Sequence, residues 1–68
     1  MTYEEAENLT VGDLFRFRES NLRRAILILS FPTVYGRNKI VMFRVFWHNK
    51  IDKFYISDTT AEAYEKIS

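Results

Sequence analysis

The fold is decided by one stretch in the middle of the chain, Lys39-Ile40-Val41-Met42-Phe43-Arg44-Val45-Phe46-Trp47. Successive side chains of a strand point to opposite faces, so the odd-numbered residues share one face and the even-numbered residues, including Arg44, share the other. Both sets are largely apolar. The stretch therefore predicts a central strand that is covered on both sides.

Other strands are predicted on either side of this stretch. The run Leu14-Phe15-Arg16-Phe17-Arg18 alternates strictly, which is typical of a half-buried strand with its Phe side chains inward and its Arg side chains outward. Residues Arg23 to Phe31 are apolar on both parities and predict another central strand, which Pro32 ends. A shorter strand is expected over Lys53 to Ser57, after a reversal at residues 48–52, while residues 33–38 are expected to form a loop.

A short helix is expected at each end of the chain. Thr2 and Glu5 have the spacing of a capping box, in which a Thr side chain and a Glu side chain accept hydrogen bonds from each other's backbone N–H, and this predicts a helix from Tyr3 to Asn8. The segment Thr59-Thr60-Ala61-Glu62 repeats the spacing, and Ala61, Tyr64 and Ile67 recur at helical intervals.

Length and composition predict one small β-rich domain over residues 1–68, because so short a chain cannot bury two cores. The expected fold is α+β, with a four- to five-stranded antiparallel sheet and short N- and C-terminal helices. The chain has no Cys and one His, which excludes a disulfide framework and argues against a structural zinc site. A core that is rich in aromatic residues, or an oligomer, must then supply the stability.

The sequence also predicts a cytoplasmic location without membrane contact. The first residues are acidic and lack the basic start and apolar run of a secretory signal. The longest apolar run, Ala25 to Leu29, is much shorter than the 18 or so residues that a transmembrane helix needs.

Charge is unevenly distributed, although the net charge is only +1. Residues 14–56 contain nine basic and two acidic residues, a balance of +7, whereas the segments before and after them carry −4 and −2. Six of the ten basic residues are Arg, whose planar guanidinium pairs with phosphate or carboxylate through two hydrogen bonds. The pattern favours an anionic partner, although basic residues on strands also prevent sheet edges from aggregating and the acidic ends can neutralise the sheet internally.

No residue pattern indicates catalysis or cofactor binding. His48 lies four residues from Asp52, yet the chain lacks a Cys or a Gly-framed Ser as nucleophile, so a solvated turn residue is the better interpretation. Glu4, Glu5 and Glu7 point in different directions on a helix and are better explained as a solvated face than as a cation site. We therefore predict that the protein is not an enzyme and has no metal or cofactor.

The segment Leu9-Thr10-Val11-Gly12-Asp13-Leu14-Phe15-Arg16-Phe17 resembles the opening of SH3-like small barrels of the KOW and Tudor kind. This resemblance implies a sheet that curls toward an SH3-like barrel. In general style, a short Cys-free basic sheet with acidic ends, the chain also looks like small accessory proteins of bacteriophages. That likeness implies a protein that binds and inhibits a host factor.

The leading functional prediction is a binding module for nucleic acid, either RNA or DNA. Basic residues would contact phosphates, and aromatic residues would stack on unpaired bases. The predicted contact residues are Arg16, Arg18, Arg23, Arg24, Arg37, Lys39, Arg44, Trp47 and Tyr55.

The alternative prediction is a protein-interaction module or inhibitor, with an acidic protein surface or a second copy of the chain as partner. It rests on the two-sided apolar strands, since two short helices cannot cover every apolar face and exposed apolar patches mark interfaces. The predicted interface residues are Val41, Phe43, Val45 and Trp47.

Overall fold

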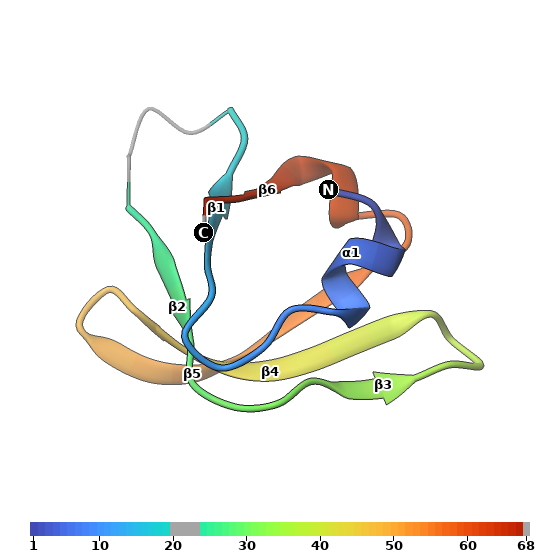
Figure 1. Ribbon diagram of the computed structural model, residues 1–68, viewed down its shortest axis with the longest axis horizontal. Coiled ribbons are helices and arrows are strands. Elements are labelled where there is room, and N and C mark those ends of the chain that lie inside the picture. Colours follow the sequence, from blue (N-terminus) through green and yellow to red (C-terminus); the bar gives the residue numbers. More distant parts are fainter. Residues whose placement is uncertain (20–23, 68) are drawn as a thin grey trace.

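A computed structural model describes residues 1–19 and 24–67, which form one antiparallel sheet with a short α-helix packed against it (Figure 1). The sequence also predicts a reversal at residues 19–22, but residues 20–22 and the predicted contact residue Arg23 lie outside the described residues. The elements are α1 (Tyr3–Glu7), β1 (Leu14–Phe17), β2 (Ile26–Ile28), β3 (Thr33–Tyr35), β4 (Ile40–Trp47), β5 (Lys50–Ser57), the 3-10 helix η1 (Ala61–Ala63) and β6 (Tyr64–Lys66).

The N-terminal helix is confirmed together with its capping box. Glu5 N–H donates to Thr2 Oγ1 at 3.1 Å, and Thr2 N–H donates to Glu5 Oε1 at 3.0 Å. These two bonds satisfy backbone donors that a helix start leaves without partners. Ala6 on α1 is completely buried, so the helix packs against the sheet through its apolar side.

The strands β4 and β5 form a long hairpin, paired without interruption from Ile40 with Ser57 to Trp47 with Lys50. Only His48 and Asn49 form the turn, and both have positive φ, as a tight two-residue hairpin turn of the mirror-image type requires. The predicted five-residue reversal is therefore wrong, since β5 already begins at Lys50.

A bulge divides the predicted strand from Arg23 to Phe31. Among the described residues, β2 covers only Ile26–Ile28, and the chain pairs again with β4 as β3, where a loop was expected. Leu29 N–H donates to the Arg44 carbonyl, but the next paired residue is Thr33, opposite Met42, so the register shifts by two residues. Ser30 Oγ accepts the Arg44 N–H at 2.9 Å and so supplies an acceptor inside the bulge.

The expected C-terminal helix is wrong. The chain makes only the short turn η1 and then continues as β6, which pairs with β1 from Phe15 opposite Lys66 to Phe17 opposite Tyr64. The backbone hydrogen bonds offered by β1 and the burial of Tyr64 outweigh the local helical spacing. Within residues 1–19 and 24–67 the sheet therefore has six strands rather than four or five. Their order is β3-β4-β2-β1-β6 with β5 on the other side of β4, and these strands do not close the sheet.

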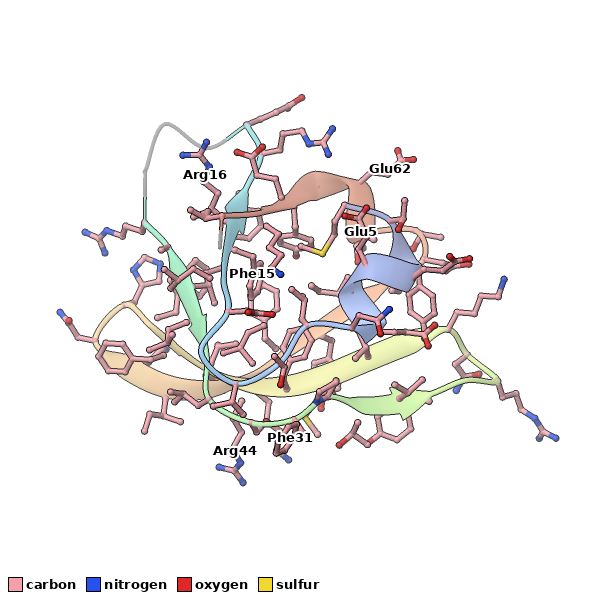
Figure 2. All side chains as sticks on the ribbon, in the orientation of Figure 1. Glu5, Phe15, Arg16, Phe31, Arg44 and Glu62 are labelled. Carbon is pink, nitrogen blue, oxygen red and sulfur yellow. The ribbon has the colours of Figure 1, made fainter. Side chains whose placement is uncertain are left out.

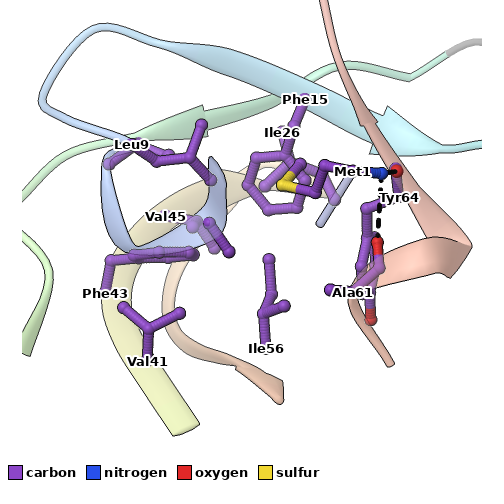
Figure 3. Close-up of a cluster of buried hydrophobic side chains, with 12 residues drawn as sticks. Met1, Leu9, Phe15, Ile26, Val41, Phe43, Val45, Ile56, Ala61 and Tyr64 are labelled. Atoms are coloured by element: carbon purple, nitrogen blue, oxygen red, sulfur yellow. Dashed lines mark hydrogen bonds between the residues drawn. The ribbon is translucent and has the colours of Figure 1, made fainter. Parts of the chain in front are cut away.

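The core lies between α1, η1 and the odd-numbered side of β4 (Figure 3). Phe15 is at its centre and meets Phe43, Phe54 and Tyr64 edge-to-face, with ring centroids 5.2 to 6.0 Å apart. Such arrangements are favourable for aromatic rings and add to the burial of apolar area. Among the described residues, no helix is long and apolar enough to cross a membrane.

Candidate binding surface

The opposite side of the hairpin sheet is not covered by any described element, and we call it the outer face. Cross-strand pairing arranges its side chains in rows, because outward residues of β4 stand opposite outward residues of its neighbours. The outer face consists of Leu27, Leu29, Phe31, Thr33, Tyr35, Ile40, Met42, Arg44, Phe46, Ile51, Lys53, Tyr55 and Ser57.

This face exposes several large apolar side chains. Phe31 is 75% exposed, Ile51 61% and Tyr55 56%, and Phe46 and Tyr35 are nearly half exposed. Scattered apolar residues are normal on a protein surface, but here they occupy consecutive rows of one sheet. The rows form one patch of exposed apolar side chains, which is why we treat this face as the candidate site.

Two cations stand directly opposite each other in the middle of the outer face. Arg44 on β4 pairs in register with Lys53 on β5, and both are exposed. The two salt bridges within the described residues, Arg16 with Glu65 and Lys66 with Asp13, do not involve this pair. Like charges directly opposite on neighbouring strands destabilise a sheet, so an anion placed between them would be attracted by both.

The bulge brings an aromatic ring beside this pair. Figure 2 shows Phe31 and Arg44 on the same side of the sheet, away from Phe15 in the core. Ser30 Oγ, which accepts the Arg44 N–H, ties the bulge to the strand position that carries the guanidinium. Bulges often redirect a side chain at functional sites, and this one leaves the Phe31 ring in contact with solvent.

The predicted nucleic-acid contacts do not form one patch. Arg44 and Tyr55 lie on the outer face, while exposed Arg37 and Lys39 lie in the turn between β3 and β4. Arg16 points to a distant part of the molecule (Figure 2), where its Nε donates to Glu65 Oε1 at 2.5 Å.

The remaining predicted contacts lie elsewhere. Arg18, also exposed, follows β1. Trp47 is half-buried and packs on Phe17 and Phe54, with ring centroids 5.8 and 6.0 Å away. Its ring also lies 4.2 Å from that of His48, whose Nδ1 is 2.8 Å from Arg24 Nη1. The structure thus brings Arg24 and Trp47 together at the hairpin turn.

Three of the four residues predicted for a protein interface are on the covered face. Val41, Phe43 and Val45 have no exposed surface, because α1 and β1 cover the odd-numbered side of β4, and only Trp47 keeps part of its side chain in solvent. The exposed residues of β4 itself, Arg44 and Phe46, have the other parity.

The predicted contact residues did not include four residues of the outer face, Phe31, Phe46, Ile51 and Lys53. A signal was present, since Ile51, Lys53 and Tyr55 alternate along β5 in register with the even-numbered residues of β4. The alternation did not predict which of the two faces of the sheet α1 would cover.

The residues whose pKa values are shifted lie on α1 and β6. Burial raises the pKa of the Tyr64 hydroxyl, and burial with the nearby charges of Glu7 and Asp58 raises that of Tyr3. The hydrogen bonds with Thr2 lower the pKa of Glu5. Among the described residues, no group of three or more His, Asp or Glu side chains is arranged to hold a metal ion.

Comparison with known proteins does not extend this description. No protein-family model matches the chain, and searches of curated proteins and of solved structures find no match either.

Proposed function

We propose that the protein is a non-catalytic binding module that takes single-stranded nucleic acid, RNA or DNA, on its outer face. The observation that carries this proposal is the exposed cation pair of Arg44 and Lys53, which has no carboxylate partner among the described residues. A phosphate group seated between the two side chains would remove their mutual repulsion and form charge-assisted hydrogen bonds with both.

Aromatic side chains on the same face support a single strand over a duplex. Phe31 and Tyr55 are more than half exposed and lie on the same face as the cation pair. Unpaired bases stack on such rings without regard to sequence, whereas the bases of a duplex are already stacked on one another. Arg37 and Lys39 at the end of the hairpin sheet would extend the path of the phosphate backbone.

Two further expectations belong to this proposal. An SH3-like barrel is supported by the pairing of the first strand with the last, which gives the sheet its curvature around Phe15. The other is a cytoplasmic setting, because a nucleic-acid partner would be met there.

Fluorescence anisotropy with a labelled twelve-residue oligothymidylate tests the proposal. Arg44→Ala and Lys53→Ala should each weaken binding roughly tenfold, since each removes a hydrogen bond between charged groups. Lys66→Ala is the matched control because it removes one positive charge from β6, away from the outer face (Figure 1). Equal losses in all three variants would indicate attraction by net charge alone and would contradict the proposed site.

A second candidate is an acidic protein surface, as expected for an inhibitor of the phage accessory kind. It is favoured by the aliphatic residues Ile51 and Leu29, which offer burial but no stacking. A homodimer through the outer face is disfavoured, since a two-fold contact would bring each cation pair close to its own copy. Binding to a protein partner that persists at high salt, without any binding to oligonucleotides, would favour this candidate.

A further inference from the structure

A pocket opens beside the outer face at the turn of the β4–β5 hairpin. It is lined by Arg24, Ala25, Phe46, Trp47, His48 and Asn49, and its volume of about 420 Å³ is within the range of sites that hold small ligands. Phe46 belongs to both the pocket and the outer face, where it stands between Leu27 and Ile51. A strand bound along the outer face would therefore pass the mouth of this pocket.

The polar groups of the pocket are fixed by one hydrogen bond. Arg24 Nη1 lies 2.8 Å from His48 Nδ1, and a guanidinium has only donors, so the imidazole nitrogen must be the acceptor. His48 is then neutral in this arrangement and carries its proton on Nε2. This bond holds the guanidinium at the pocket, and no second hydrogen bond joins its other N–H groups to a described residue, so they face the pocket as donors for a ligand.

The chemistry of the lining selects a ligand with a flat ring and acceptor atoms. Arg24, the Nε2–H of His48 and the amide of Asn49 are donors, and the six lining residues include no carboxylate. Phe46 is nearly half exposed, and Trp47 offers part of its ring. A phosphate would use the donors but gain nothing from two aromatic rings, whereas a base uses both.

We propose that this pocket binds a guanine base of the single strand, with Arg24 donating two hydrogen bonds to O6 and N7 while the base stacks on Phe46. Guanine presents two adjacent acceptors at the spacing of the guanidinium fork, whereas adenine presents an acceptor and a donor on the same edge. The inference rests on the function proposed above, because the outer face supplies most of the affinity and the pocket supplies a preference for one base.

The test compares twelve-residue oligothymidylates that carry one central substitution by guanine, adenine or 7-deazaguanine. The wild-type protein should bind the guanine oligonucleotide about tenfold more tightly than the adenine one, and 7-deazaguanine should lose much of this gain because it lacks N7. Arg24→Lys keeps the charge but not the fork, so it should abolish the preference and leave affinity for plain oligothymidylate nearly unchanged. Its urea unfolding curve should match that of the wild type, since Arg24 is exposed.

Four other outcomes would contradict the proposal, and each identifies the step that is wrong. Tight binding without base preference would overturn the guanine pocket while leaving the outer face as the site. A guanine preference that survives Arg24→Lys would overturn the assigned recognition. If Arg24→Lys weakens every oligonucleotide equally, the pocket binds backbone phosphate and the inference is wrong. Absence of binding to all four oligonucleotides would overturn the proposed function, and this inference with it.

Discussion

The two faces of β4 carry similar side chains in opposite surroundings. On the inner face Val41, Phe43 and Val45 are fully enclosed by the aromatic core, α1 and β1. On the outer face the neighbouring residues Arg44 and Phe46 are exposed. The comparison separates two reasons for apolar residues in a strand, which are to stabilise the fold and to meet a partner.

The electrostatics of the two faces differ as well. Among the described residues, no polar or charged side chain is buried as a whole, so the inner face meets the usual requirement that a core be apolar. The outer face instead places Arg44 opposite Lys53, an arrangement that weakens the sheet. A local loss of stability that brings no structural benefit is expected at functional sites.

The largest expected effect comes from truncating a Phe on each face of β4. Phe43→Ala should lower the free energy of unfolding by about 3–5 kcal/mol, since it leaves a cavity in the core, and this is enough to unfold so small a domain. Phe46→Ala should cost less than about 1 kcal/mol, because nearly half of that side chain is already in water. Urea unfolding of both variants measures this difference. Similar losses of unfolding free energy in the two variants would contradict the distinction between a covered and an exposed face.

Lys53→Glu should separate stability from binding. The new carboxylate would stand opposite Arg44 and replace a repulsion by an attraction, which raises the free energy of unfolding by about 0.2–1 kcal/mol. The same change should weaken oligonucleotide binding more than tenfold, since it neutralises the proposed phosphate site. Parallel urea and anisotropy titrations check both parts. A variant that gains affinity along with stability would show that the pair has no role in binding.

Protonation of Glu5 at low pH should destabilise α1, the helix that covers the inner face. Its pKa is lowered below the ordinary value of 4.5, first by the Thr2 N–H bond, so the folded state favours the ionised form. This contribution is therefore fully present above pH 4.5 and is lost as the pH falls through the lowered pKa.

Glu5→Gln should be less stable than the wild type at neutral pH, and the difference should vanish in acid. Thermal unfolding of both proteins between pH 2 and 7 measures this trend. A difference that stays constant over the whole range would contradict the role given to the carboxylate. Glu4→Gln is a suitable control, because Glu4 is exposed on the same helix and its carboxylate accepts no hydrogen bond from a described residue.

A modest gain in stability is expected at Tyr3, on the helix that covers the inner face. Its hydroxyl is the one buried side-chain polar atom without a hydrogen-bond partner among the described residues. Tyr3→Phe should raise the free energy of unfolding by about 1 kcal/mol, since it removes a buried polar group that gains nothing from the fold. A loss of stability in urea unfolding would instead reveal a partner for the hydroxyl.

Elements governed by local patterns were predictable from the sequence. The Thr2–Glu5 spacing predicted α1, the alternation around Phe15 predicted β1, and the apolar residues of both parities along residues 39–47 predicted β4. Elements that depend on distant partners were not. The helical spacing of Ala61, Tyr64 and Ile67 hid β6, which forms because β1 offers it a free edge.

The candidate site was predictable only in part, for a related reason. Arg44 and Tyr55 were expected to contact nucleic acid, but Lys53 becomes important only through its register opposite Arg44. Phe31 is displayed by a bulge that depends on the contact of Ser30 with β4, fourteen residues away. The odd-numbered and even-numbered residues of β4 were correctly assigned to two different faces. Which of these faces is covered, however, is decided by the packing of α1 and β1.

The central claim is that the cation pair of the outer face contacts phosphates, and the salt dependence of oligothymidylate binding tests it most directly. For single strands, each phosphate neutralised contributes about 0.7 to the slope of log affinity against log salt concentration. Replacing both Arg44 and Lys53 by Ala removes the one phosphate contact that the two side chains share, so this slope should become shallower by about 0.7, while Lys66→Ala leaves it almost unchanged. A slope that is the same in the double variant and the wild type would contradict the account.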